Sequence, residues 1–536
     1  MKRLALSALI FSAAAHADVT LPFITFHNDN SLGGANTGAV FSINSGGTEL
    51  AIGSYEYPSL SDNGNRTVAT YVPVTPSQSG LGSSTDNVTW KYKFSGFNNT
   101  AFRGMFCPTC STGYKDPISV SNSEMTLPYN PTSGAFGFVG LTMSASLVDY
   151  LLAMGAGQSE TVTTSAYTKG GTVLASTQNN VLQKLGNYNL DNSAHLEFAV
   201  DPITGEINIK SGITGQRCTP YQHIALRGLL CDVMKYSYQG SSVAAYSGSL
   251  SLSVSKLNPL LDGFQGKGLT VSLTFDERTW YDLSNGSLGT PATFADTFLQ
   301  QPSKEGGQAS LKMFFPTDFI KAVALKGEAS NLTDIVTLCL NKPLASIGAD
   351  FCFRPGKGIS VIPVEPSIEI KPDNPDYALD PTGYGGTGKG KIGSSEPITI
   401  PYSIYTTSKD PAIAVTGRIT GPGKPLNGQD YCLFSGVGGV SGLEVPVPGD
   451  VLIGLSRTRY NHNCTGTSFD IPAPSTSPGE WMRLMSPLSA DLSVWKTPLI
   501  LQFPMNNPVS AKTYAGGYWD GVVSAQGSIE VSASWN

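Results

Sequence analysis

Eight cysteines are the residues with the most readily interpreted chemistry in this 536-residue chain. In an oxidising compartment, an even number of cysteines is typical of a set of disulfides. The cysteines follow one another in four neighbouring pairs, so we expect sequential pairing, while the sequence leaves other connectivities open: Cys107/Cys110, Cys218/Cys231, Cys339/Cys352 and Cys432/Cys464.

The Cys-Pro-Thr-Cys run at 107–110 has the spacing of a thiol-disulfide oxidoreductase motif. In such enzymes the reactive cysteine lies at a helix N-terminus, which lowers the pKa of its thiol. The flanking segments 101–106 and 111–117 are typical of a strand and a turn. We therefore favour a structural disulfide at this position over a redox centre.

A glycine-rich run at 383–389 matches the pattern G-x-x-x-x-G-K of a phosphate-binding loop. Position 390 is Gly, where such a loop needs the Ser or Thr hydroxyl that binds Mg²⁺. No helical pattern follows the run. We therefore expect a flexible glycine-rich loop and no nucleotide site.

The remaining residue patterns do not predict a catalytic or metal centre. No G-x-S-x-G motif stands at a strand-to-helix turn. Paired carboxylates for glycoside hydrolysis come together only on folding, so a carbohydrate-active enzyme stays open as an alternative. We expect no cofactor and no metal, because the histidines after position 17 lack the spacing of a helical metal site: His27, His195, His223 and His462.

The N-terminus has the composition of a secretory signal peptide. Lys2 and Arg3 precede an apolar stretch, and Ala15-His16-Ala17 is a typical cleavage site. We expect residues 1–17 to be removed on export, and no later apolar run is long enough for a membrane-spanning helix. The formal net charge of -6 provides no basic surface for nucleic acid.

Alternation of apolar and polar residues dominates the rest of the chain. One example has Val88, Trp90, Tyr92 and Phe94 on every second position. Such a pattern puts one face of a strand in a core and the other in water, and repeated strands with turns between them predict antiparallel β-sandwiches. Only 144–154 and 318–325 have helical spacing.

Proline- and glycine-rich segments predict the domain boundaries. The clearest lies near residue 360, and a weaker one follows residue 257. We expect an N-terminal domain at 18–257, a middle β domain or second part of the same region at 258–365, and a C-terminal domain at 366–536.

The C-terminal segment places four apolar residues on one face of a strand: Ile529, Val531, Ala533 and Trp535. A sandwich that stops after such a strand could lack the strand that completes its sheet. An ordinary terminal strand is the alternative, and the pattern alone does not decide between them.

This C-terminal run, together with 415–422 and 429–434, resembles the pilin-like domain of tip adhesins and initiators of alternative (α-family) chaperone-usher pili. The family includes the enterobacterial common pilus and the CblD-like and colonisation-factor-type initiators. The likeness extends in similar order through 187–192, 196–200 and the Cys218/Cys231 loop. Cys339 and Cys352 have no counterpart that we can place.

The resemblance implies an exported protein at a pilus tip on the cell surface, active in adhesion and biofilm formation. Its C-terminal domain would be an incomplete immunoglobulin-like sandwich, filled first by a periplasmic chaperone strand and then by the N-terminal extension of the major pilin, with an outer-membrane usher as a further partner. Ile529, Val531, Ala533 and Trp535 would then form the strand and core beside the groove for that donor strand.

The N-terminal region would bind a host-cell or surface receptor such as a glycan. Relatives of the colonisation-factor branch resemble lectins that use exposed basic residues, but no motif transfers those residues to this chain. The cysteine loops hold side chains with little entropy left to lose on binding, although solvated surface is the alternative for each. The receptor-binding residues that we predict are Arg103, Arg217, Tyr221, His223 and Arg227.

The sequence therefore predicts an all-β protein of tandem immunoglobulin-like β-sandwich domains. We expect a non-enzymatic pilus tip adhesin that starts a chaperone-usher fibre by donor-strand complementation. The alternative is a secreted β-sandwich carbohydrate-active enzyme.

Overall fold

The computed structural model describes the chain in segments separated by gaps. The described residues are 19–29, 37–42, 50–53, 67–70, 88–99, 101–106, 114–115, 119–121, 124–129, 140–167, 178–191, 195–211, 218–241, 250–262, 269–283, 291–326, 330–332, 335–343, 348–356, 358–373, 385–437, 443–462 and 464–536. The expected signal peptide, Cys107, Cys110 and Arg217 lie outside them.

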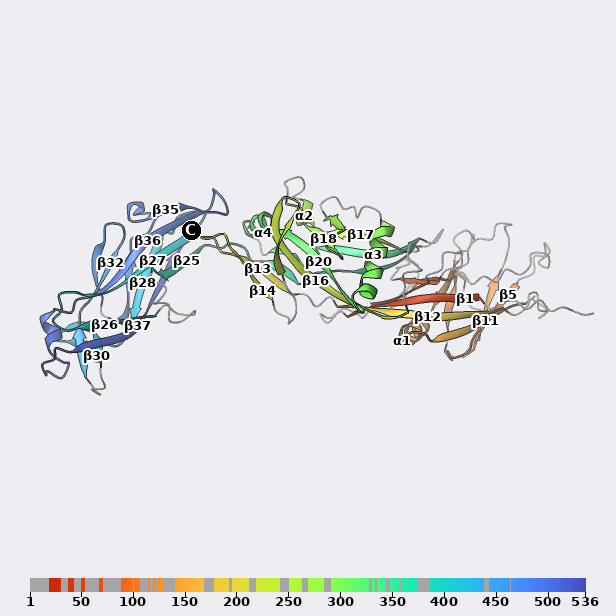
Figure 1. Ribbon diagram of the computed structural model, residues 1–536, viewed down its shortest axis with the longest axis horizontal. Coiled ribbons are helices and arrows are strands. Elements are labelled where there is room, and N and C mark those ends of the chain that lie inside the picture. The colour runs from red at the N-terminus through yellow and green to blue at the C-terminus, as the bar shows by residue number, and fades with distance from the viewer. Residues whose placement is uncertain are drawn as a thin grey trace, which may run out of the picture. The chain divides into compact units, whose positions relative to one another are not determined.

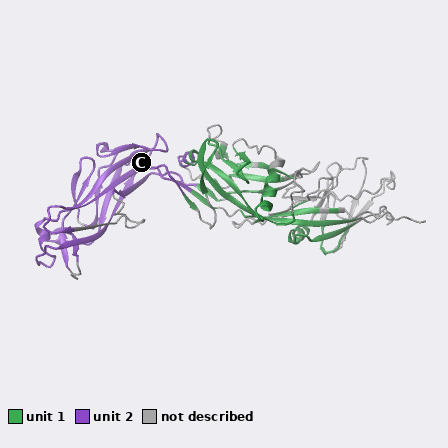
Figure 2. Ribbon diagram, in the orientation of Figure 1, with its two compact units in different colours: residues 1–197, 209–320, 331–360 green, residues 198–208, 321–330, 361–536 purple. Residues whose placement is uncertain are grey.

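The chain divides into two compact units (Figure 2). Unit 1 comprises 1–197, 209–320 and 331–360, and unit 2 comprises 198–208, 321–330 and 361–536. The domain boundaries at 257/258 and 365/366 stay predictions.

A 14-stranded sheet organises unit 1 (Figure 1). Its central strands are long because period-two apolar residues continue through them, as in β16, where buried and exposed positions alternate. Most neighbours are antiparallel, but β1 pairs with β12 in parallel over eleven residues. The strands are β1 (Val19–Asp29), β2 (Thr37–Ser42), β3 (Leu50–Gly53), β4 (Thr67–Thr70), β5 (Val88–Phe94), β8 (Ser119–Ser121), β9 (Glu124–Tyr129), β11 (Ser159–Tyr167), β12 (Gln178–Asp191), β15 (Cys218–His223), β16 (Leu226–Gly240), β18 (Ser272–Thr274), β19 (Trp280–Asp282) and β20 (Gln308–Pro316).

Three smaller sheets accompany it. The first contains β6 (Phe102–Phe106), β7 (Tyr114–Lys115) and β10 (Gly140–Met143). The second contains β17 (Ser251–Leu257), β22 (Val336–Pro343) and β23 (Gly348–Phe353). The third contains β13 (Leu196–Val200), β14 (Ile207–Ser211), β21 (Ser330–Asn331) and β24 (Ile359–Val361).

Four short α-helices occur in the described chain. They are α1 (Ala145–Ala153), α2 (Pro259–Asp262), α3 (Pro291–Lys304) and α4 (Thr317–Ala324). Ser144 caps α1, since its side-chain oxygen accepts a hydrogen bond from the Leu147 N–H. α1 and α4 lie where the sequence indicated helices, whereas α3 was not expected. None of the helices in these segments has the length and apolar composition to span a membrane.

Aromatic side chains from sequence-distant strands fill the core of unit 1. The Phe26 ring of β1 stacks on Tyr188 of β12 with 4.9 Å between centroids. Burial raises the pKa of Tyr188, whose hydroxyl donates to the Leu299 carbonyl of α3 at 2.8 Å. A buried hydroxyl that has a partner avoids the cost of desolvation.

Unit 2 is a sandwich of two antiparallel sheets. One sheet has the order β25-β27-β36-β32-β33 with β35 beside β36; the other has β29-β30-β37-β28-β34, with β26 on β37 and β31 on β30. The strands are β25 (Ser367–Pro372), β26 (Gly385–Lys391), β27 (Ile398–Ser408), β28 (Ala414–Thr420), β29 (Gly423–Leu426), β30 (Gln429–Gly436), β31 (Glu444–Val447), β32 (Gly449–Ile453), β33 (Thr458–His462), β34 (Thr465–Ile471), β35 (Met482–Met485), β36 (Ser493–Phe503) and β37 (Val522–Ser534), with 3₁₀ turns η5 (Pro478–Glu480) and η6 (Pro508–Ala511).

The core of unit 2 lies between these sheets. Ile404, Val451 and Leu499 of the first sheet and Val523 of the second are fully buried, and Phe434 of the second is almost so. This arrangement confirms the all-β prediction. The expectation of a glycine-rich loop at 383–389 was wrong, because 385–391 form β26 and pair with β37.

Candidate functional site

The strand β37 has different partners along its length. Its first half, Val522–Ser528, pairs with β26. Its second half, Ser528–Ser534, pairs with β28. Near its beginning, Val523 and Ser524 also pair with β30.

The direction of single hydrogen bonds shows which edge each partner occupies. The carbonyls of Val522 and Ser534 accept from residues beside β30 and β28, Val437 and Ile413, whereas the Gly521 carbonyl accepts from Ile392 after β26. Neither pairing of β37 has a register shift. Since backbone groups alternate between edges along a strand, even-numbered residues face β28 and β30, and odd-numbered residues face β26.

Beyond Ser528, one edge of β37 therefore lacks a partner strand among the described residues. The N–H and C=O groups of Ile529, Val531 and Ala533 point to the side on which β26 has ended. Within the described residues, no strand pairs with this half edge. Unpaired backbone groups at a sheet edge are a template for another strand.

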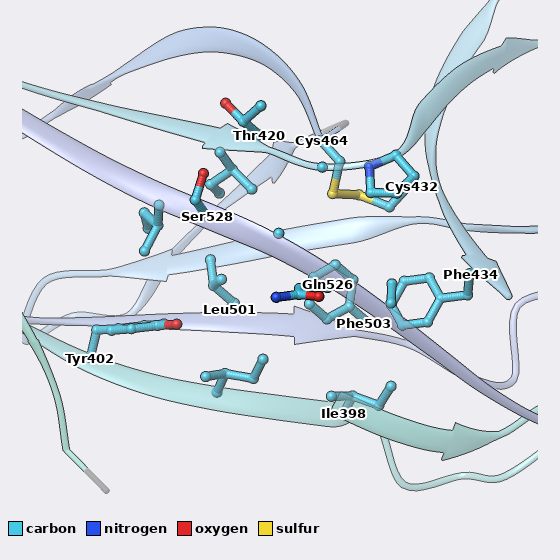
Figure 3. A pocket seen from close by; sticks show the side chains of 17 residues that line it. Ile398, Tyr402, Thr420, Cys432, Phe434, Cys464, Leu501, Phe503, Gln526 and Ser528 are labelled. Carbon is cyan, nitrogen blue, oxygen red and sulfur yellow. A yellow bond between two sulfur atoms is a disulfide. The ribbon is translucent and has the colours of Figure 1, made fainter. Parts of the chain in front are cut away.

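An apolar cavity of about 40 Å³ lies between the sheets beneath β37 (Figure 3). Ile398, Ile400 and Tyr402 of β27 line one side, and Leu501 and Phe503 of β36 adjoin them. Backbone and side chains of 525–529 border the cavity from β37. Lost contacts around an empty apolar space destabilise a core, so a side chain that entered it would be favoured.

The four apolar residues predicted for the terminal strand are all on its core-facing side. Ile529 is 4% exposed, and the other three are half-buried against the core: Val531, Ala533 and Trp535. The indole N–H of Trp535 is buried without a hydrogen-bond partner in the described chain. A buried N–H donor without a partner lowers the free energy of unfolding. This end of β37 therefore has a hydrogen-bond donor that the described residues do not satisfy.

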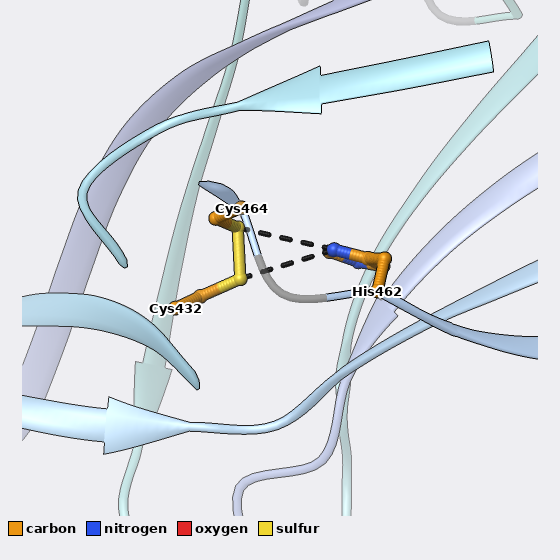
Figure 4. Close-up of side chains that lie close together, drawn as sticks. All are labelled: Cys432, His462 and Cys464. Atoms are coloured by element: carbon orange, nitrogen blue, oxygen red, sulfur yellow. Dashed lines mark hydrogen bonds between the residues drawn. A yellow bond between two sulfur atoms is a disulfide. The ribbon is translucent and has the colours of Figure 1, made fainter. Parts of the chain in front are cut away.

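The Cys432–Cys464 disulfide lines the same cavity, with His462 against it (Figure 4). The His462 Nδ1 atom lies 3.8 Å and 3.9 Å from the two sulfurs. Burial lowers the pKa of His462 to about 4, while the nearby Asp450 carboxylate acts in the opposite direction. Because both sulfurs are in the disulfide, only the imidazole offers a metal-ligand atom here.

A second disulfide joins the adjacent strands β15 and β16. Cys218 and Cys231 are directly opposite in the register. The third, Cys339–Cys352, joins β22 to β23 in the same way. Three of the four sequential pairs favoured by spacing are thus bonded, and Cys107/Cys110 lies outside the described residues.

The β15–β16 hairpin carries three of the predicted receptor residues on two faces, because Arg227 lies opposite Gln222 in the register while Tyr221 and His223 are on the other face. Tyr221 and His223 alternate on β15, and their rings lie 5.5 Å and 4.1 Å from the ring of Trp280. Burial lowers the pKa of His223, against the pull of Asp282. Arg227 is exposed on β16. Trp280 was not identified from the sequence, because nothing in its local pattern places it beside a hairpin about sixty residues away.

The hairpin ends in a two-residue turn that contains an exposed apolar residue in a left-handed backbone conformation. Ile224 is 86% exposed and has φ 55, a left-handed conformation that β-branched residues rarely adopt. A large apolar side chain that is both strained and exposed is a candidate contact residue. Arg103 lies on β6, in another sheet, so the structure does not group it with this hairpin.

Comparisons with known proteins show which proteins this chain resembles. Residues 365–533 match the family model described as the EcpD C-terminal domain. The chain is 24% identical over 313 residues to "Fimbria adhesin EcpD" of Escherichia coli O157:H7 and of strain K12, covering 58% of this chain and 53% of each relative. The chain thus spans about half the length of the curated relatives it matches.

A solved structure, CfaE, the adhesive subunit of the CFA/I fimbria of enterotoxigenic Escherichia coli, is 12% identical with a TM-score of 0.17, covering 59% of this chain and 87% of that one. At that score the similarity adds nothing to the assignment. Residues 365–533 are therefore similar to the EcpD C-terminal domain, and the chain is similar over 313 residues to fimbria adhesins named EcpD.

Proposed function

We propose that this chain is a fimbrial adhesin whose unit 2 is completed by an extended strand from another protein. The observation that carries the proposal is the half edge of β37 at 529–534, which no described strand pairs with and which begins at Ile529 beside an apolar cavity. The family match and the fimbria adhesin relatives support it. These relatives also favour a non-enzymatic role over the carbohydrate-active alternative.

Strand addition suits this edge physically. An incoming strand gains main-chain hydrogen bonds with the odd-numbered residues of β37, and its alternate side chains face the core. One such side chain would fill the cavity beside Leu501 and Phe503. A strand without backbone N–H groups would lose the main-chain hydrogen bonds. A strand without apolar residues at every second position would lose the contacts with the core.

The partners follow from a pilus context. A periplasmic chaperone would supply the first strand, an outer-membrane usher would receive the complex, and the major pilin would replace the chaperone strand with its N-terminal extension. Export through the signal peptide at 1–17 would bring the protein to the pilus tip at the cell surface. Residues 18–257 would carry receptor binding, with 258–365 as a second part of that region and 366–536 as the pilin domain.

The receptor site that we propose is the β15–β16 hairpin. Tyr221 and His223 present phenol and imidazole groups on one face of this disulfide-bonded hairpin, and Arg227 presents its guanidinium on the other face. Such a scaffold loses little conformational entropy on binding. Arg217, Arg103 and the Cys107/Cys110 turn stay predicted contributors.

A peptide titration tests the proposed strand addition. The probe is a synthetic peptide with the sequence of the cognate pilin's N-terminal extension, added to the full-length mature protein. Binding to the folded state alone stabilises it by about 2.7 kcal/mol at a hundredfold excess over the dissociation constant. We expect the melting temperature to rise and the amides of 529–534 to become protected from hydrogen exchange.

The matched control is the same peptide with proline at alternate backbone positions, which cannot complete the hydrogen-bond ladder. It should leave both readouts unchanged. Equal effects of the two peptides, or a melting temperature indifferent to both, would reject strand addition at this edge.

A further inference from the structure

A polar hollow of about 780 Å³ lies on unit 2, separate from the apolar cavity. It is formed where the β29–β30 turn, the start of β32, the end of β33 and the segment after β36 come together. None of its lining residues lines the cavity beneath β37. Its size is that of a small-molecule site.

A buried charge lies in the wall of the hollow. Asp450 is 2% exposed, and its Oδ2 accepts a hydrogen bond from the Arg459 guanidinium. The second carboxylate oxygen, Oδ1, accepts no hydrogen bond from any described residue. The Arg459 side chain is 62% exposed, so the pair presents both an acceptor and further N–H donors to whatever enters.

Three side-chain amides in the lining have no hydrogen-bond partner among the described residues: Asn461, Gln502 and Asn506. Each offers a carbonyl acceptor and two N–H donors. Their neighbour Asn507 differs, because its Oδ1 accepts from the Val509 N–H and caps η6. Unlike Asn507, these three amide side chains make no hydrogen bond that stabilises the fold of the described residues.

We propose that this hollow binds an uncharged saccharide. Neighbouring hydroxyl groups on a sugar both donate and accept, which matches a carboxylate, a guanidinium and free amides. An anion would meet two carboxylates, Asp430 and Asp450, against one guanidinium. A cation at Asp450 Oδ1 would lie close to the Arg459 guanidinium, which is held on Oδ2 and would repel it.

This site goes beyond the proposed adhesin function, since it belongs to the unit that accepts the strand and not to the region proposed to bind the receptor. Occupancy would link a pilus subunit to a surrounding polysaccharide. The proposal does not depend on strand addition, because the two sites share no lining residue.

Ligand-observed NMR on the full chain tests the proposal. The probes are glucose, galactose, mannose and N-acetylglucosamine at millimolar concentration, with saturation transferred from the protein. We expect transfer to at least one sugar and its loss in the double variant Asn461→Ala/Asn506→Ala. Removing two hydrogen bonds at about 1 kcal/mol each should weaken binding by about tenfold or more.

Two controls keep the result interpretable. The melting temperature of the double variant should equal that of the wild type, because neither amide has a partner to lose, and its response to the pilin peptide should be unchanged. Gln308→Ala removes an exposed amide on β20, outside the hollow, and should leave saturation transfer intact. Absence of transfer to all four sugars, or equal transfer to the double variant, overturns the proposal.

Discussion

At the scale of single residues, His462 is the group most sensitive to acid in unit 2. Its imidazole lies between the Cys432–Cys464 disulfide and Asp450, and its ring meets that of Phe503 at 5.4 Å. The Nε2 atom is buried and has no partner within the described chain. A charged imidazole would therefore be poorly solvated there.

We predict that acidification from pH 6.5 to 4 weakens unit 2 through this residue. The folded-state pKa of about 4 lies below the ordinary value of 6.5, so the unfolded state binds the proton more readily and stability falls with pH in that window. The full effect is about 3 kcal/mol. Urea unfolding at pH 4.5 and 7 should show it, and His462→Gln should reduce the difference. If the variant has the same pH dependence as the wild type, His462 is not the acid-sensitive group.

Ile224 gives a second test at this scale. Its left-handed backbone strains a β-branched residue by about 1–2 kcal/mol, which glycine would relieve. We predict that Ile224→Gly raises the free energy of unfolding by about 1 kcal/mol. If the hairpin tip contacts the receptor, the same variant binds target cells more weakly. A variant that is more stable and binds as well as the wild type would leave the tip without a binding role.

At the scale of elements, β26 depends on glycine for close packing against the neighbouring strands. A Cβ on Gly390 would lie 2.7 Å from the Met505 Sδ and 2.9 Å from the Ile398 Cγ1. Real side chains do not approach so closely, so one of the neighbours would have to move.

We predict that Gly390→Ala lowers the free energy of unfolding by about 1–3 kcal/mol. Gly479→Ala is the matched control, since a Cβ there meets nothing within 4 Å and the residue has no positive φ. Thermal melts of both variants should separate them. Similar melting temperatures would show that β26 tolerates a side chain and that its contact with the core is loose.

The same elements show how far the sequence could predict the structure. The alternation through Ile529, Val531 and Ala533 indicated a half-buried strand because period-two burial follows directly from strand geometry. The run at 385–391 has no apolar alternation, so its strand was missed. Close packing against Met505 and Ile398 explains Gly390. Helix α3 was missed because it contains Pro302, a residue that normally ends a helix.

The candidate sites were predictable only in part. Cysteine spacing pointed to the Cys218/Cys231 hairpin, and hence to Tyr221 and His223. Trp280 and the polar hollow could not be found, because their neighbours come from strands far apart in the sequence. Such groupings depend on tertiary register, which no local pattern encodes.

At the scale of the whole molecule, we predict that receptor binding and strand capture are separable. Arg227→Ala should weaken cell binding of the full chain and leave the response to the pilin peptide intact. Val531→Asp places a charge against the core beside the open edge and should abolish the peptide response while cell binding persists. Cell-binding assays and melts in the presence of peptide measure both. If either variant loses both cell binding and the response to the peptide, the assignment of receptor binding to unit 1 and strand capture to unit 2 is wrong.

The parallel pairing of β1 with β12 also determines the order in which the chain can fold. The Thr25 hydroxyl of β1 donates to the Gly186 carbonyl of β12, which is 161 positions away. Closing so long a loop costs entropy before any contact compensates for it, and topologies rich in such contacts fold slowly. A chain delivered N-terminus first can pair β1 with the nearby β2, where Phe23 lies opposite Ser42 and Phe26 opposite Ala39, but the other edge of β1 has to wait until β12 has arrived.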